Sequence, residues 1–183
     1  GSSEALSAAV VNTMPFISSN EEGNFLVTWA EPSNNGSEIY GKISDPSGND
    51  ITAAFQISSF EGYHQNHSTS VGLPNGNYAV FWGSDADNAE ARSKGQIVGS
   101  DGLLIGSEFS VSTGYAFDPQ PIVLENGNIL VAWRDKDSDH LGSSARIFEA
   151  DGTPLFQEFR LNENPVSVSI NAKMAELSDG KFV

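Results

Sequence analysis

The sequence contains no cysteine, which excludes a disulfide framework and thiol chemistry. Basic residues are also scarce: nine Lys and Arg stand against 24 Asp and Glu, for a formal net charge of −15. This charge repels nucleic-acid phosphates and anionic membrane surfaces, so we expect no nucleic-acid partner. No apolar run approaches the roughly 18 residues that a membrane-spanning helix needs, so we expect no membrane span.

What the sequence does contain is a repeat. Gly-Asn followed by an apolar run that ends in Trp occurs three times, at residues 23–29, 76–82 and 127–133. The three glycines are 53 and 51 residues apart, and a fourth copy begins at Gly180. Self-similarity at a fixed period of this size is typical of repeat architectures.

Each repeat contains four short runs separated by turns. In the second repeat these runs cover residues 70–73, 78–82, 95–97 and 109–111. An Asp-Gly or Ser-Gly pair precedes the last run, and such pairs favour a hairpin. Four runs with turns between them predict a four-stranded antiparallel meander. The run that ends in Trp is apolar on both faces, which predicts a sheet covered on both sides. No segment shows a helical period.

These patterns predict an all-β, β-propeller-like array of four-stranded antiparallel blades, forming one repeat domain over residues 1–183. Three blades are expected at residues 14–58, 68–112 and 119–163, with a partial blade at 170–183. The alternative is a sandwich or jelly roll of about 12 to 14 strands. The fidelity of the repeat favours the propeller.

The two ends of the chain resemble different strands of the same blade. Residues 4–13 resemble the fourth strand of a repeat, and residues 170–183 resemble the first strand and part of the second. We expect the N-terminal strand to pair with the C-terminal one, in the same chain or in a second copy that completes the ring. The alternative is that further blades lie outside this sequence. Uncovered blade faces are apolar, so an open array is expected to form a homo-oligomer.

The repeat is clearest at residues 127–162, where Gly-Asn-x-x-Val-x-Trp is followed by Arg-Ile-Phe-x-Ala-Asp-Gly-Thr-Pro. It resembles the propeller-like tandem repeats of large secreted bacterial proteins of the RTX, haemolysin-type calcium-binding or adhesin class. The resemblance implies an extracellular or cell-surface location and a binding or spacer role. The calcium-binding nonapeptide of that class is absent, and no catalytic residue is carried over.

The topology of a meander predicts where a site would lie. Tight turns gather at one end of each blade, and the longer loops gather at the other, where binding residues concentrate. Two of these loops are acidic, with candidate metal ligands Asp85, Asp87, Asp135, Asp137 and Asp139. Carboxylates at alternate positions of a curled loop can converge on calcium, which takes six to eight oxygen ligands. We therefore predict calcium as a cofactor; the alternative is a solvated acidic turn.

Aromatic and imidazole side chains occur in the connections between repeats. The candidate ligand-binding residues are Tyr63, His64, His67, Tyr115 and Phe117. Gly-Tyr occurs in both connections, and exposed aromatic rings beside polar side chains favour a glycan ligand. The alternative is that the tyrosines pack over the seam between blades. His64 and His67 are three residues apart, and His140 lies in the acidic loop of the third repeat; two histidines and an Asp could bind zinc, which is a weaker hypothesis.

The leading expectation is a non-catalytic extracellular module that binds a glycan or cell-surface ligand, or acts as a spacer, and is stabilised by calcium. One alternative is a fragment of a glycan-active propeller hydrolase. Such enzymes use two carboxylates that flank the scissile bond, but the many Asp and Glu of this sequence single out no pair. Another alternative is a purely structural array of blades.

Overall fold

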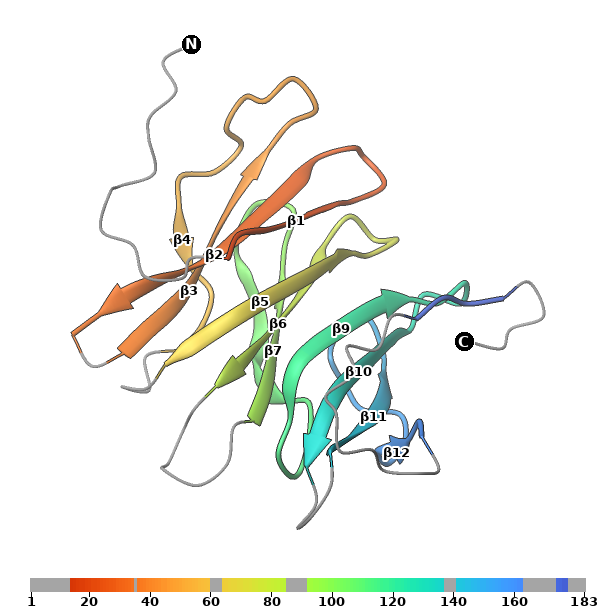
Figure 1. Cartoon of the computed structure of the whole chain (residues 1–183). Coiled ribbons are helices and arrows are strands. Elements are labelled where there is room, and N and C mark those ends of the chain that lie inside the picture. The colour runs from red at the N-terminus through yellow and green to blue at the C-terminus, as the bar shows by residue number, and fades with distance from the viewer. Residues whose placement is uncertain are drawn as a thin grey trace.

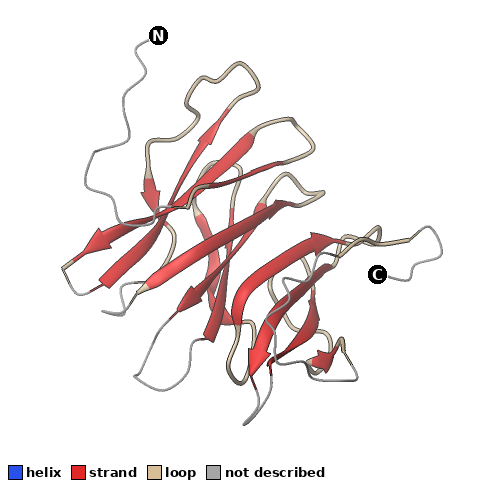
Figure 2. Cartoon of the chain, in the orientation of Figure 1, coloured by secondary structure: helices blue, strands red, loops and turns tan. Residues whose placement is uncertain are grey.

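The computed structural model describes residues 14–34, 36–59, 64–84, 92–136, 141–162 and 174–177. These residues form β-strands in three four-stranded antiparallel sheets, and no helix occurs among them (Figure 2). The expected all-β class is confirmed. It follows that the described part of the chain has no helix of the length and apolar character that crossing a membrane requires.

Each sheet is a meander of four consecutive strands (Figure 1). Blade 1 contains β1 (Phe16–Ser19), β2 (Phe25–Ser33), β3 (Gly36–Ser44) and β4 (Phe55–Gln56). Blade 2 contains β5 (Gln65–Gly72), β6 (Tyr78–Ser84), β7 (Arg92–Val98) and β8 (Leu104–Ser110). Blade 3 contains β9 (Phe117–Val123), β10 (Ile129–Lys136), β11 (Leu141–Phe148) and β12 (Phe159–Arg160). The fourth strand is short in blades 1 and 3, where only two residues pair with the third strand.

A tight turn follows the first and the third strand of each blade. Each turn is closed by a backbone hydrogen bond that a glycine N–H donates to the carbonyl three residues earlier. The glycines are Gly23, Gly48, Gly76, Gly102, Gly127 and Gly152, with φ between 78° and 88°. Glycine adopts this left-handed conformation without a steric penalty. The turns lie at one end of each blade, so the loops between second and third strands lie at the other, as predicted.

The blades pack face to face through apolar side chains. Tyr78, Val80 and Trp82 of β6 pack against blade 1 in one buried cluster. Ala79 and Phe81, on the opposite face of β6, belong to a cluster with blade 3. The expected cover on both faces is therefore confirmed for β6. On β2, by contrast, Phe25 and Val27 face away from blade 2 and are only half-buried, because no other described sheet packs against them; Trp29, on the same face, is buried.

The three tryptophans occupy equivalent buried positions, each as the fifth residue of its strand, in β2, β6 and β10. Trp29, Trp82 and Trp133 expose 7%, 0% and 2% of their surface. The Trp82 indole Nε1 donates a hydrogen bond of 2.7 Å to Gln65 Oε1. The prediction of equivalent, mostly buried tryptophans is confirmed.

The first strands of the three blades, β1, β5 and β9, lie side by side while the outer strands fan away (Figure 1). Ser18 Oγ and Ser70 Oγ share a hydrogen bond of 2.7 Å between β1 and β5. Thr69 Oγ1 donates one of 2.8 Å to the Pro119 carbonyl of β9. Gly72 permits the close approach, because a Cβ there would lie 2.1 Å from the backbone oxygen of Ser19.

Most of the expected terminal segments, including all of residues 4–13, lie outside the described residues. Of the C-terminal segment, residues 174–177 are described. Met174 packs against the face of blade 3 that points away from blade 2. Glu176 Oε2 accepts a hydrogen bond of 2.6 Å from the Glu125 backbone N–H. Pairing between the two termini stays a prediction.

Candidate functional site

A left-handed residue stands at or near the start of the first strand in every blade. Met14, His67 and Asp118 have φ values of 23°, 52° and 53°, and they are the non-glycine residues with positive φ among those described. Each lies six residues before the residue that opens the first turn of its blade. The conformation is thus a property of the repeat, at the loop end of the strands that lie innermost.

This conformation produces a bulge. The pairing register between β5 and β6 shifts between Asn66 and Thr69, on either side of His67. A bulge redirects the side chains around it, and left-handed non-glycine residues are enriched at ligand sites. The bulge therefore marks the start of β5 as a candidate site.

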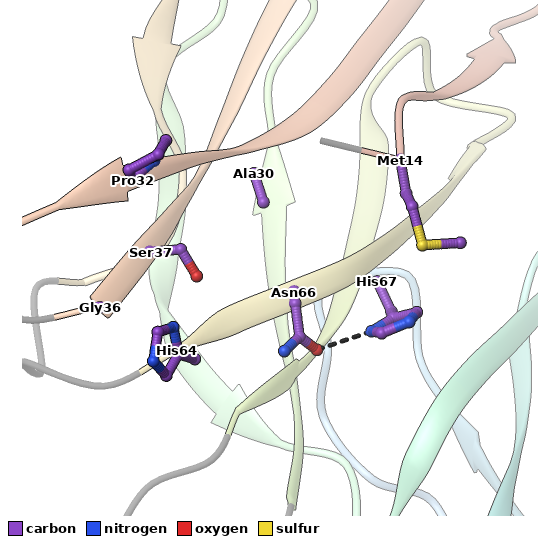
Figure 3. Close-up of a pocket in the computed structure, with 8 residues that line it drawn as sticks. All are labelled: Met14, Ala30, Pro32, Gly36, Ser37, His64, Asn66 and His67. Atoms are coloured by element: carbon purple, nitrogen blue, oxygen red, sulfur yellow. Dashed lines mark hydrogen bonds between the residues drawn. The ribbon is translucent and has the colours of Figure 1, made fainter. Parts of the chain in front are cut away.

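A cavity of about 340 Å³, here named the inner pocket, adjoins this bulge between blades 1 and 2 (Figure 3). Its lining comes from β2, β3, β5 and the residues before β1: Met14, Ala30, Pro32, Gly36, Ser37, His64, Asn66 and His67. The volume is at the lower end of the range for small-molecule sites. The predicted ligand residues His64 and His67 both line it.

The inner pocket contains polar groups in a mostly apolar lining, with no carboxylate, ammonium or guanidinium group among them. Asn66 Oδ1 and His67 Nδ1 share a hydrogen bond of 2.8 Å, which Figure 3 marks. Since an amide oxygen only accepts, Nδ1 carries the proton, and a neutral imidazole then keeps Nε2 as an acceptor. Ser37 Oγ donates to the Gln65 carbonyl at 2.8 Å. The pocket therefore combines donors and acceptors with the apolar surface of Met14.

Phe117 lies between the bulge at His67 and blade 3, where the pairing register between β9 and β10 also shifts, between Ala132 and Arg134. Its ring centroid lies 4.8 Å from that of His67. The Arg134 guanidinium also lies over the Phe117 ring, 4.8 Å from its centroid. Arg134 Nη2 in turn forms an ion pair of 2.6 Å with Asp118 Oδ2. These contacts hold the His67 ring at the loop end of the first strands.

Tyr115 and Asp135 line a second cavity of about 170 Å³ between blades 2 and 3, here named the seam pocket. The structure thus divides the predicted ligand residues between two pockets, with Phe117 near the first. When the repeats are aligned on their first turns, Tyr115 corresponds to His64. The Gly-Tyr pattern suggests Tyr63 instead, one residue earlier. The predicted residues Tyr63, Asp85, Asp87, Asp137 and Asp139 lie outside the described residues.

Asp135 is the one predicted calcium ligand that the structure describes. Its Oδ2 accepts a hydrogen bond from the Ser144 hydroxyl, and its Oδ1 lies 3.6 Å from Arg160 Nη2. Within the described residues, no three His, Asp or Glu side chains gather closely enough to hold a metal ion. The calcium site stays a prediction, because its other carboxylates lie outside that part; so does the zinc hypothesis, which involves His140.

Sequence reasoning missed several residues of both pockets. In the inner pocket these are Met14, Ser37 and Asn66; in the seam pocket they include Ser144 and Glu158. The available signal was each residue's position within the aligned repeat. Asn66 directly precedes the left-handed His67, and Ser144 is opposite the repeated tryptophan on the neighbouring strand.

Comparison with known proteins gives matches at the level of structure. No protein-family model matches the chain, and no curated protein does. A protein of unknown function from Dyadobacter fermentans superposes with a TM-score of 0.61 at 17% identity, covering 80% of this chain and 40% of the other. An endo-arabinase from Bacteroides thetaiotaomicron gives 0.57 at 12% identity, covering 92% and 67%. A thermostable family-43 glycoside hydrolase gives 0.53 at 14% identity, covering 84% and 55%.

The sheets of this chain match propeller blades of the family-43 type. The fold is that of a β-propeller array. At these low identities the likeness shows the fold alone. The chain spans 40% of the length of the Dyadobacter protein and 55% of the family-43 hydrolase. The expected propeller is confirmed, and the sandwich alternative is set aside.

Proposed function

We propose that this chain forms part of an extracellular β-propeller that recognises glycans at the loop end of its blades. Two observations support the proposal. Several structures that resemble the chain are of glycan-active enzymes, among them the endo-arabinase and the family-43 hydrolase. The inner pocket opens at the same end as the longer loops, where a rigid scaffold most often carries ligands.

The lining of the inner pocket is the observation that carries the proposal. A sugar is uncharged and presents many hydroxyl groups, so it needs both donors and acceptors, and it has apolar faces that need cover. The pocket offers the Asn66 amide and the imidazoles of His64 and His67, with Met14 as apolar cover. Few, well-placed polar groups in a mostly apolar cavity are typical of small-molecule sites.

Binding without catalysis is the reading that the described carboxylates favour. A glycosidase needs one carboxyl group as acid and another as base or nucleophile. At the loop end, each described carboxylate nearest the pockets has a protein partner. Glu31 accepts from Trp29 Nε1, Asp118 pairs with Arg134, Asp135 with Arg160, and Glu158 accepts from Thr113. These groups support the packing of the blades.

Hydrolysis is the second candidate, and the structural comparisons favour it over an adhesin role. The matched enzymes act on glycans, whereas the adhesin-like role rests on the resemblance of the sequence repeat. In a hydrolase, the acid and base would come from carboxylates outside the described residues, and the predicted acidic loops supply Asp85 and Asp137 as candidates.

Affinity electrophoresis of the full chain in gels that contain arabinan, arabinoxylan or galactan tests recognition. We expect at least one polysaccharide to retard the protein. Asn66→Ala and His67→Gly are expected to remove the retardation; glycine is chosen at position 67 because it accepts the left-handed backbone. Leu104→Ala, on the exposed edge strand β8, is the matched control. No retardation in any gel, or full retardation of both pocket variants, would contradict the proposal.

A reducing-end assay on the same polysaccharides separates the two candidates. Binding with no release of reducing ends supports a recognition module. Release by the wild type, lost in Asp85→Asn or Asp137→Asn while the retardation persists, would establish the hydrolase instead.

A further inference from the structure

The residue opposite the repeated tryptophan differs from blade to blade. The pairing registers place Trp29 opposite Tyr40, Trp82 opposite Lys94, and Trp133 opposite Ser144. Directly opposed residues of an antiparallel pair point to the same face of the sheet. This third-strand position therefore lies on the face that carries the tryptophan.

Large side chains fill that position in the first two blades. Tyr40 stacks on Trp29, with ring centroids 6.5 Å apart and planes 24° apart. In blade 2, Lys94 Nζ lies 3.3 Å from Glu108 Oε1, and only 20% of the Lys94 side chain is exposed. The surface beside the tryptophan is occupied in both blades.

Blade 3 has a serine at this position, and the seam pocket of about 170 Å³ lies there. The partner carboxylate is kept, whereas Arg160 stands opposite Ser144 where blade 2 has Ser110 opposite Lys94. Glu158 stands where Glu108 stands in blade 2, each directly before the phenylalanine of the fourth strand. Both carboxylates also accept a hydrogen bond from the end of the preceding blade: Ser59 donates to Glu108, and Thr113 donates to Glu158. The seam pocket therefore lies in blade 3 at the place that the Lys94 side chain fills in blade 2.

The seam pocket has the chemistry of a sugar subsite. Trp133 and Tyr115 supply aromatic surface, with Trp133 nearly buried and Tyr115 half-buried. Asp135 supplies a carboxylate whose Oδ1 accepts no hydrogen bond from the described residues, although it lies within ion-pair distance of Arg160. A carboxylate accepts strong hydrogen bonds from hydroxyl groups, and a guanidinium beside it donates to them.

We propose that the seam pocket binds a single neutral sugar ring, as a second contact for the glycan recognised at the inner pocket. The volume corresponds to about five or six water molecules, too small for more than one ring. Asp135 and Glu158 disfavour acidic sugars by charge repulsion. The inference rests on the proposed function for the class of ligand, but it involves separate residues and a separate pair of blades.

The blade 2 arrangement supplies the variant that tests this proposal. Ser144→Lys places in blade 3 the lysine that blade 2 already contains, with Glu158 as the partner that Glu108 is for Lys94. The variant should therefore fold while filling the pocket. Lys94→Ser is the reciprocal control, because it alters the seam between blades 1 and 2 and leaves the seam pocket unchanged.

Binding is followed by NMR through the three tryptophan indole N–H signals of the full chain, assigned with Trp→Phe variants. L-arabinose and D-galactose are the neutral probes, and N-acetylneuraminic acid is the acidic one. We expect at least one neutral sugar to shift the Trp133 signal and leave that of Trp29 unchanged, with the acidic sugar inactive. Ser144→Lys is expected to weaken binding at least tenfold, and Lys94→Ser to retain it.

Three results would overturn the proposal: no Trp133 shift with either neutral sugar, an equal shift with the acidic sugar, or an unchanged shift in Ser144→Lys. The gel experiment distinguishes a failure of the seam-pocket proposal from a failure of the proposed function. If Asn66→Ala abolishes retardation while the NMR probes leave Trp133 unmoved, glycan recognition stands and the seam pocket is only a packing gap. If no polysaccharide retards the protein but Trp133 responds to neutral sugars, the inner pocket is the part that fails.

Discussion

Trp82 lies in the seam between blades 1 and 2 with no exposed surface. Trp82→Ala leaves a cavity there and removes the donor to Gln65, so we expect the free energy of unfolding to fall by about 3–5 kcal/mol. Urea denaturation measures the change. Leu104→Ala is the control, because 46% of Leu104 is exposed and its loss should cost less than about 0.5 kcal/mol. Equal losses in the two variants would contradict this account of the seam.

Tyr78 gives the fold a sensitivity to high pH. Burial, with a smaller effect from the Glu22 charge, raises the pKa of Tyr78 to about 12 from its ordinary value of 10.0. The folded state therefore favours the neutral phenol, which donates a hydrogen bond of 2.9 Å to the Asn24 carbonyl. A group with a raised pKa stabilises the fold fully below pH 10 and loses that contribution as the pH rises through about 12.

The corresponding prediction concerns the slope of stability against pH. Between pH 10 and pH 12 the wild type should lose stability more steeply than Tyr78→Phe, which has no phenol to ionise. At pH 8 the variant should be less stable by about 1 kcal/mol, because one hydrogen bond between blades is lost. Urea denaturation across this pH range gives both quantities. Parallel pH profiles for the two proteins would show that another group controls alkaline unfolding.

At the scale of single residues, the sequence predicted the burial of the repeated tryptophans but not the backbone conformation of residues whose identity differs between repeats. The depth of Trp29, Trp82 and Trp133 followed from their shared place at the end of an apolar run. The left-handed conformation of His67 and Asp118 did not, because glycine is the usual signal for positive φ and neither position has one. The bulge arises from how the inner strands approach one another, which is a tertiary effect.

Among the elements, the glycine turns fix where each blade reverses direction. At Gly127 φ is 83°, and a Cβ would meet only Pro74, at an ordinary distance of 3.9 Å. Gly127→Ala should therefore cost about 1–2 kcal/mol from the backbone conformation alone. Gly114→Ala is the matched control, because Gly114 has no positive φ and open space around its Cβ position. Thermal unfolding compares them; similar losses would refute the conformational explanation.

The strand pattern of each blade was predictable, but the differences between corresponding strands were not. Apolar residues on both faces of β6 and β10 indicated cover on both sides, as found. The sequence did not show that the third-strand residue opposite each tryptophan decides whether the seam is filled. That requires the register of β10 against β11, which places Ser144 opposite Trp133.

At the scale of the whole molecule, the net charge of −15 leads to the prediction about calcium. If Asp135, Asp137 and Asp139 bind the ion in the folded state only, a hundredfold excess over Kd should stabilise the fold by roughly 2.7 kcal/mol. Thermal unfolding of the full chain in millimolar calcium and in chelator measures this, and Asp137→Ala should remove the difference. Identical melting temperatures in both buffers would leave the loop as a solvated acidic turn.

The order of the blades, and the end of each blade at which the longer loops lie, could be predicted from the repeat and the meander topology. The ligand could not, because repeated residues are those that pack blades together, whereas His64, Asn66 and Ser144 are specific to single blades. A glycan ligand is therefore a proposal built on the pockets and on the likeness to glycan-active propellers.

The most direct test of that proposal is hydrogen–deuterium exchange of the full chain with and without a polysaccharide that retards it in the gel. The account predicts slower exchange in peptides covering residues 64–72 and 112–120, at the loop end of β5 and β9, and unchanged exchange in the turns at residues 20–24, 73–77 and 124–128. Protection confined to those turns, or spread evenly over the three blades, would contradict a glycan site at the loop end.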